Sequence, residues 1–282
     1  MATNEESKEQ QRRQWSSNAA TWDEQHDRLE RETAAVTLWL CEKAGIGPGM
    51  KVLDLACGSG HPALDEAQLV QPNGSVVATD LVEEMVEATS RRARSAGLDN
   101  LDARVMDAEA IDFADETFDA ITCRFGLMFC PDPLRAAVEV RRVLKAGHRF
   151  ALSVWDEPQK NPGQTVLGEA LARMGRVRAP VDYDSPGIHQ LAPPGKLERV
   201  LREAGFDEIS LESLSRESEY ESFEALCGRM LARPGSQRAI VEQMSGEEVQ
   251  RLRNELADIV KPYTRDGIIR LRTTPLCAVA TK

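Results

Sequence analysis

The sequence predicts an α/β fold in which a parallel β-sheet carries helices on both faces. Two observations lead to this prediction. Short apolar runs typical of buried strands alternate with helical patterns as far as residue 154, and such alternation favours a parallel sheet. In addition, the first predicted strand opens into a helix through a turn that contains glycines, the arrangement found where nucleotides bind to such sheets.

The first strand is predicted at residues 52–55, where three of the four residues are apolar. A turn of small residues follows at 56–60, and a helix is predicted over 63–69. Glycines in the turn allow the backbone to bend sharply and to approach a ligand closely. Ala63 occupies the position of the third glycine of the dinucleotide-binding pattern. By its spacing alone the turn is therefore a weak signal, and a tight turn without a ligand is the alternative.

Asp54 lies near the end of this strand, where a fixed negative charge would repel a phosphate group. The ligand expected at the turn is therefore neutral or cationic. The stretch 52–60 resembles the first motif of the class I S-adenosylmethionine-dependent methyltransferases, with two small conservative replacements. The resemblance implies that Asp54 helps to hold the cationic methionine end of S-adenosylmethionine, and that Ala56, Gly58 and Gly60 belong to the cofactor-binding turn.

Composition argues against several classes of function. The 282 residues carry a formal net charge of −11, which disfavours nucleic acid or an anionic membrane as a partner. No apolar run approaches the roughly 20 residues that span a bilayer, and residues 1–14 lack the apolar core of a signal peptide. Six scattered cysteines without a Cys-x-x-Cys pair fit a reducing cytoplasm. Because no cluster has metal-ligand spacing, we expect a cytoplasmic protein without a metal.

The N-terminal residues 1–45 are expected to form a helical lid. Residues 5–18 have helical propensity and lead into a small, polar loop bracketed by Trp15 and Trp22. The two tryptophans could simply pin the first helix to the core, or, as similar segments in relatives imply, could cover the cofactor. A second helix is predicted at 32–44 from its apolar periodicity, and glycines and a proline end it.

The second strand is predicted at 75–79 and ends at Asp80, which lies 20 residues beyond Gly60. An acid in this place binds the ribose hydroxyls in doubly wound nucleotide folds, although an aspartate could equally cap the helix that follows. The resemblance adds Leu81 and Met85 to the cofactor site. Met85 would pack on the adenine ring, and an ordinary core position is the alternative.

The third strand is predicted at 101–105, and the run that follows it matches the adenine-reading pair of the same family. Asp107 would accept a hydrogen bond from the exocyclic amine, and the residue after it, Ala108, would donate its backbone N–H to a ring nitrogen. A solvated acidic loop is the alternative. Two further cofactor residues are expected directly after the fourth strand, predicted at 118–123, namely Arg124 and Phe125.

The segment 118–154 resembles the ubiquinone/menaquinone C-methyltransferase branch and its small-molecule relatives. It contains Phe-Asp-Ala-Ile, Phe-Gly-Leu-Met-Phe, Pro-Asp-Pro and Arg-Val-Leu-Lys-Ala-Gly, with a helix predicted over 134–145. The resemblance implies a Rossmann-like, mostly parallel sheet of seven strands in the order 3-2-1-4-5-7-6, with the last strand antiparallel. Residues 46–155 are expected to form the S-adenosylmethionine-binding core.

From residue 156 onward, prolines and glycines interrupt the pattern and indicate an inserted helical cap on the substrate side. Residues 156–282 are therefore expected to combine cap helices with the last strands of the core sheet. The helices are predicted over 166–174, 196–204, 223–231 and 247–260. The strands are predicted over 209–214 and 268–280.

The sulfonium of S-adenosylmethionine is already electrophilic, so the protein mainly supplies orientation and a dry pocket. No catalytic residue is assigned, and the candidates for substrate contact are His61, Tyr183 and His189. The predicted function is methyl transfer to a small-molecule acceptor, with S-adenosylhomocysteine as product, by a monomer or homodimer. The alternative is a protein of the same fold that only binds the cofactor or catalyses a reaction other than methyl transfer.

Overall fold

The computed structural model describes residues 3–177 and 181–282. Two helices come first, α1 (Asn4–Glu24) and α2 (His26–Ala44). The loop predicted between Trp15 and Trp22 is wrong, because both tryptophans lie inside α1. They are seven residues apart, so a helix puts both rings on one face where they can be buried together. The second helix also begins earlier than its apolar periodicity predicts.

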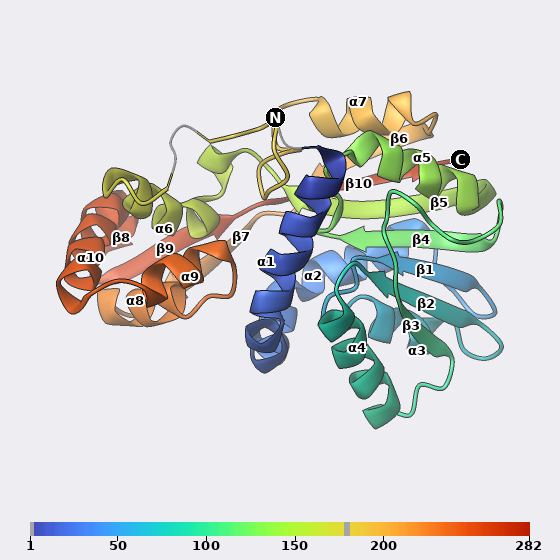
Figure 1. The fold of residues 1–282 in the computed structure, drawn as a ribbon, viewed down its shortest axis with the longest axis horizontal. Helices are drawn as coiled ribbons and strands as arrows, with labels where there is room; N and C mark the ends of the chain where they lie inside the picture. Colours follow the sequence, from blue (N-terminus) through green and yellow to red (C-terminus); the bar gives the residue numbers. More distant parts are fainter. Residues whose placement is uncertain (1–2, 178–180) are drawn as a thin grey trace.

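A seven-stranded sheet forms the centre of the molecule, and its order is β3-β2-β1-β4-β5-β10-β6 (Figure 1). Strands β1 to β5 run parallel to one another. Strand β10, the last strand of this sheet along the chain, pairs antiparallel with β5 and β6. The predicted fold class, strand order and antiparallel last strand are therefore confirmed. The strands are β1 (Lys51–Leu55), β2 (Ser75–Asp80), β3 (Leu101–Val105), β4 (Phe118–Arg124), β5 (Leu144–Trp155), β6 (Asp207–Ser213) and β10 (Pro275–Thr281).

Successive residues of a strand point to opposite faces of the sheet, and here apolar residues point to both faces. Helices therefore cover both faces. Val52 of β1 faces the core under α2, α3 (Ala63–Leu69) and α4 (Glu83–Ser95). Leu53, the next residue, belongs to the opposite core, which contains residues of α5 (Pro133–Val143), α7 (Lys196–Glu203) and the short helix η1 (Leu127–Phe129). Because these strands run parallel, their carboxyl ends lie along one edge of the sheet.

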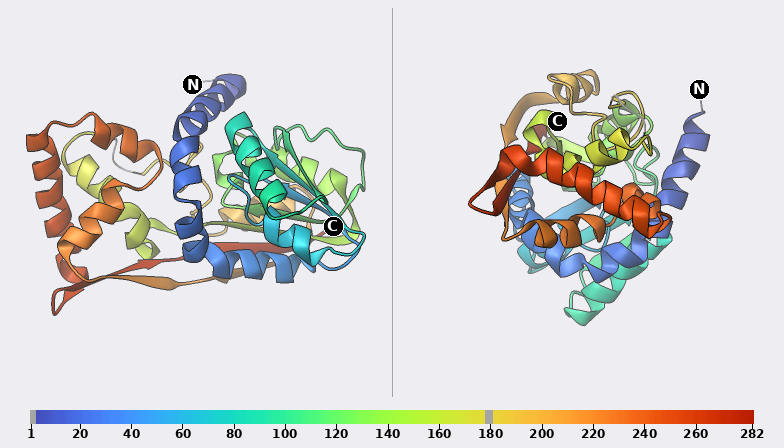
Figure 2. Two further views of the ribbon diagram at one scale, coloured as in Figure 1. Left: turned by 90° about the horizontal axis from the view of Figure 1, so that it is seen from below. Right: turned by 90° about the vertical axis from the view of Figure 1, so that its left-hand side faces the viewer.

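A second lobe is built around a three-stranded sheet of order β7-β9-β8 with its own apolar core. Figures 1 and 2 show two long ribbons, β6–β7 and β9–β10, that run from the central sheet into this lobe, with α1 standing between the lobe and the sheet. Its elements are α6 (Pro162–Arg173), β7 (Arg216–Tyr220), α8 (Phe223–Leu231), α9 (Ser236–Glu242), α10 (Gly246–Val260), β8 (Thr264–Arg265) and β9 (Ile268–Thr273), with the short helices η2 (Pro158–Lys160) and η3 (Lys261–Tyr263).

The single strand predicted at 268–280 is wrong, because the chain divides at Thr274 into β9 and β10, which belong to different sheets. The backbone of Thr274 forms hydrogen bonds with residues that precede α6, and not with a neighbouring strand. Its N–H donates to Asn161 Oδ1 at 2.6 Å, and its carbonyl accepts from the N–H of Asp156 at 3.1 Å. These contacts redirect the strand toward the lobe. In the described residues, no helix is long and apolar enough to cross a bilayer.

Candidate cofactor and acceptor site

The turn after β1 depends on small residues. Ala56, Gly58 and Gly60 have φ values of +56°, +54° and +131°, which glycine adopts without steric cost. A Cβ on Gly60 would lie 2.8 Å from Leu64 Cδ1, so a side chain there would displace the start of α3. A Cβ on Gly58 would meet nothing within 4 Å, which leaves that part of the turn open to a ligand.

Asp80 connects the end of β2 to this turn. Its Oδ2 accepts from the N–H of Gly58 at 2.9 Å, and its Oδ1 accepts from the N–H of Val82 at 3.1 Å. Burial raises the pKa of Asp80 to about 6, against the opposing effect of these backbone donors. The carboxylate thus lies between the carboxyl ends of β1 and β2, the location that its predicted role as a ribose ligand requires.

Asp54, in contrast, is completely buried beneath the turn. Its Oδ2 accepts from the N–H of Ala63 at 3.2 Å, and its Oδ1 accepts from the Thr122 hydroxyl at 3.4 Å. The same hydroxyl donates to Glu66 Oε1 at 2.6 Å. Burial, and next the charge of Glu66, raise the pKa of Asp54 well above its usual range. Asp54 fixes the start of α3 under the turn, and its contact with the cofactor's ammonium group stays a prediction from the sequence.

Asp107 already has a cationic partner. Lys8 of α1 is 2.6 Å from Asp107 Oδ2 and 2.9 Å from Glu109 Oε2, and its side chain is 8% exposed. Asp107 Oδ1 accepts from the N–H of Glu109 at 2.8 Å. Ala108 lies between the two acids, half-buried. An adenine amine at Asp107 would therefore share the carboxylate with Lys8 or displace it.

The N-terminal helix packs across the start of α4 through its two tryptophans. Trp15 and Trp22 contact the apolar cluster that contains Leu81 and Met85. The Trp15 ring also packs edge-on against Phe129 of η1, with ring centroids 4.9 Å apart. Helix α1 therefore bridges the segments that follow β2 and β4. The predicted cofactor residues Leu81 and Met85 lie directly beneath it.

Arg124 ends β4 and Phe125 follows it, but the two side chains have different surroundings. Arg124 Nη1 donates to Glu30 Oε2 at 2.7 Å and to the hydroxyls of two α2 threonines, Thr33 and Thr37, at 2.8 Å each. Its charge is thus used to tie β4 to α2. Phe125 has a φ of +58°, and its ring stacks on Trp155 at the end of β5 with a centroid separation of 4.5 Å. This pair forms an aromatic wall at the carboxyl edge of the sheet.

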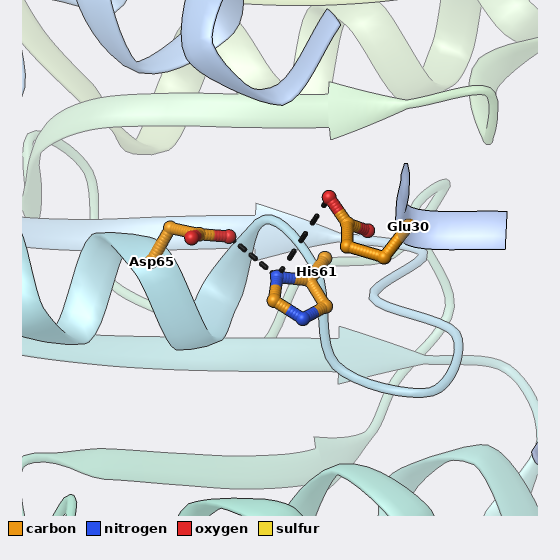
Figure 3. A group of neighbouring side chains, drawn as sticks. All are labelled: Glu30, His61 and Asp65. Carbon is orange, nitrogen blue, oxygen red and sulfur yellow. Dashed lines mark hydrogen bonds and ion pairs between the residues drawn. The ribbon is translucent and has the colours of Figure 1, made fainter. Parts of the chain in front are cut away.

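His61 lies immediately after the turn with two carboxylates facing one ring nitrogen (Figure 3). Its Nδ1 is 2.5 Å from Asp65 Oδ2 and 4.0 Å from Glu30 Oε1. The ring stacks on His26 with centroids 5.0 Å apart. Burial lowers the pKa of His26 to about 4, so this second imidazole is neutral at pH 7.

Within the described part of the chain, Glu30, His61 and Asp65 are grouped closely enough to ligate a metal ion. The guanidinium of Arg124 contacts the same Glu30 carboxylate, and a positive charge so close disfavours a bound cation. The absence of a resident metal stays a prediction from the sequence.

The two remaining substrate candidates differ in position. His189 is buried, burial lowers its pKa, and its Nδ1 has no hydrogen-bond partner in the described structure. Its segment packs on η1, since the N–H of Gly187 donates to the carbonyl of Met128 at 2.9 Å. No contact among the described residues joins Tyr183 to the other candidates, and its carbonyl accepts from Lys196 Nζ at 2.6 Å.

Sequence reasoning did not assign Lys8, Glu30 or Trp155 to the site. Lys8 and Glu30 lie on helices whose docking onto the sheet no local pattern reveals. Trp155 is the last residue of the motif Phe-Ala-Leu-Ser-Val-Trp. Its position at the carboxyl end of a parallel strand is the signal that could have assigned it to the site.

The sheet order, the small-residue turn after β1 and the acid at the end of β2 define the class: this is the fold of the class I S-adenosylmethionine-dependent methyltransferases. Comparison with known proteins identifies the family. The model of the ubiE/COQ5 methyltransferase family matches residues 24–217, and the chain belongs to this family.

Among similar proteins, the ubiquinone/menaquinone biosynthesis C-methyltransferase UbiE of Shewanella oneidensis is 30% identical over 183 residues, which cover 62% of this chain and 73% of that protein. Uncharacterized protein Rv1405c of Mycobacterium tuberculosis is 35% identical over 147 residues, covering 52% of this chain and 50% of that protein. The chain thus spans about half the length of this relative.

Solved structures resemble this one over most of its length. A presumed methyltransferase from Bacillus halodurans has a TM-score of 0.60 and 25% identity, covering 87% of this chain and 98% of that chain. The [4+2]-cyclase SpnF has a TM-score of 0.53 and 20% identity, covering 88% of this chain and 80% of that chain. The second likeness concerns the fold alone.

Proposed function

We propose that this protein transfers a methyl group from S-adenosylmethionine to a small-molecule acceptor. One observation carries the proposal: the Asp80 carboxylate accepts from the N–H of Gly58 at 2.9 Å. This bond joins the acid after β2 to the turn after β1, so a ribose and a methionine chain can be held side by side at one edge of the sheet. Membership of the ubiE/COQ5 methyltransferase family supports the same activity.

The bound cofactor supplies an electrophilic methyl group, so the chain's own residues need to bind, orient and exclude water. We assign Asp80 to the ribose hydroxyls and Asp107 with Ala108 to the adenine. Helix α1 covers this region through Trp15 and Trp22, which keeps water from the cofactor. In this proposal residues 1–45 form the lid, 46–155 the cofactor-binding core, and 156–282 the acceptor cap with the last core strands.

Binding and transfer are tested separately. Isothermal titration with S-adenosylmethionine should give saturable binding to the wild type and binding at least tenfold weaker to Asp80→Ala. Asp102→Ala is the matched control, because Asp102 is an exposed aspartate of β3 whose one ion pair among the described residues is with its neighbour Arg104. If the wild type does not bind the cofactor, the proposal fails.

A specific observation keeps a second function in view. The fold of this chain is shared with the [4+2]-cyclase SpnF, so the alternative is a protein that binds the cofactor without transferring its methyl group. Incubation with tritiated-methyl S-adenosylmethionine and cell extract separates the two. Label that reaches an acceptor supports the methyltransferase, whereas cofactor binding without labelled product supports the alternative.

We further propose a cytoplasmic monomer or homodimer that does not bind nucleic acid or membrane. The net charge of −11 supports the absence of both polyanionic partners. All six cysteines are free thiols, five of them buried, as a reducing compartment favours. Analytical ultracentrifugation measures the oligomeric state, and an assembly larger than a dimer would contradict this proposal.

A further inference from the structure

An excess of positive charge lies where the second lobe meets α2. Arg28 Nε is 3.8 Å from Glu32 Oε1, and Arg229 contacts the same oxygen. Arg216 donates to the carbonyl of Glu32, and the charges of Glu32, Arg28 and Arg229 also act on Arg233. Four arginines, called here the arginine cluster (Arg28, Arg216, Arg229 and Arg233), thus gather around Glu32, two of them at its carboxylate, in a protein whose formal net charge is −11.

The arginine cluster is partly withdrawn from water. The side chains of Arg28 and Arg229 are 31% and 32% exposed, and burial lowers the pKa of Arg233. Arg28 Nε is buried and has no hydrogen-bond partner among the described residues. Like charges held together with incomplete hydration and an unsatisfied donor cost free energy. A bound anion would remove this cost, because it supplies both the missing charge and the missing acceptor.

A cavity of about 290 Å³ lies beside the arginine cluster, and Glu32 and Arg216 form part of its lining. Trp155 lines the same cavity and stacks on Phe125 at the end of β4. Arg216 is the member of the arginine cluster that lines this cavity, so the cavity connects its guanidinium region to Trp155 at the carboxyl edge of the sheet, where the proposed cofactor site lies. One small molecule in this cavity can place an anionic group near Arg216, at the border of the arginine cluster, and its remaining atoms against Trp155.

We propose that the arginine cluster binds an oxyanion of the methyl acceptor, so the acceptor is a small molecule that carries a carboxylate or a phosphate group. Guanidinium groups bind both oxyanions through paired N–H donors. This inference rests on the proposed methyltransferase function, but the anion site itself can be tested without cofactor.

The test measures binding of inorganic phosphate and of acetate to the full chain by isothermal titration at low ionic strength, where screening is weak. Arg28→Gln should weaken binding roughly tenfold by removing a charge and a donor, and Arg28→Lys should weaken it less because it keeps the charge. Glu32→Gln should tighten binding roughly fivefold, since it removes the carboxylate that Arg28 and Arg229 contact. Arg173→Gln is the control, because Arg173 lies on α6 outside the cluster and is 45% exposed.

Binding of phosphate alone would support a phosphorylated acceptor, and binding of acetate would support a carboxylate. Equal affinities in the wild type, Arg28→Gln and Glu32→Gln would mean an adventitious ion only and would overturn the inference. A merely structural role of Glu32 also fails to predict tighter anion binding in Glu32→Gln. Cofactor binding without anion binding refutes this inference alone. Anion binding with the expected variant effects, but without cofactor binding, supports the anion site and refutes the proposed function.

Discussion

Replacing Asp80 by asparagine should affect stability and cofactor binding in opposite directions. Burial raises the pKa of Asp80 from 3.8 to about 6, and each pKa unit corresponds to about 1.4 kcal/mol. The ionised carboxylate of this half-buried side chain therefore costs at most about 3 kcal/mol of folding free energy. The amide removes that cost, but its single oxygen replaces two acceptors, and one unpaired backbone N–H costs about 1–3 kcal/mol. We expect Asp80→Asn to gain between zero and about 2 kcal/mol at pH 7.

The gain should depend on pH with a defined sign. Because the folded pKa of Asp80 is raised above the unfolded value, folding favours the protonated acid. The stability contributed by Asp80 is therefore present below the unfolded pKa of 3.8 and is lost as the pH rises through the folded pKa of about 6. Relative to the wild type, Asp80→Asn should become progressively more stable across this window and keep a constant advantage above it.

Cofactor binding should weaken in the same variant. Ribose hydroxyls donate to an ionised carboxylate more strongly than to an amide, and losing a charged acceptor costs about 1.5–3 kcal/mol, or roughly 10- to 100-fold in affinity. Urea unfolding between pH 4 and pH 8 measures the stability, and titration with S-adenosylmethionine measures the affinity, with Asp102→Asn as control. A stability difference that does not vary with pH, or unchanged affinity, would refute the reasoning.

Three further predictions concern packing and the N-terminal helix. Gly126→Ala puts a Cβ 2.4 Å from Ala56 Cβ and should lower the unfolding free energy by about 1–3 kcal/mol in urea titrations. Leu256→Ala in the fully buried lobe core should cost about 2–5 kcal/mol in thermal unfolding, without changing cofactor affinity. Lys8→Met leaves the Glu109 carboxylate buried without its cation, so limited proteolysis should cut α1 faster in this variant than in the wild type. In the wild type, added S-adenosylmethionine should slow the cutting of α1.

The central sheet was predictable because its signals are local. Strands β1, β2 and β4 are short, mostly buried runs, and the helix at 63–69 and the strand at 101–105 occur as predicted. Asp80 could be assigned to its place because it ends a strand, and the carboxyl ends of parallel strands share one edge. The antiparallel arrangement and the order of the last strands came from family resemblance and not from periodicity.

Other features depend on contacts between distant parts of the chain. Strand β7 is polar at most positions, and the apolar continuity of residues 268–280 hides the break at Thr274, which exists because Asn161 binds its backbone. Asp54 is buried where the start of α3 binds its carboxylate through the N–H of Ala63, a contact that a strand pattern does not reveal. Lys8 reaches Asp107 across 99 positions of sequence, so no window of local residues contains that ion pair.

The two chain segments that join the lobe to the sheet are fastened to each other. Ser215 Oγ lies 3.0 Å from Thr274 Oγ1, and the N–H of Leu214 donates to the carbonyl of Pro275 at 2.9 Å. Because these bonds join the two segments, we expect them to move together, so that any displacement of the lobe bends both at the same point. An acceptor that enters beside the lobe would therefore depend on both segments bending together.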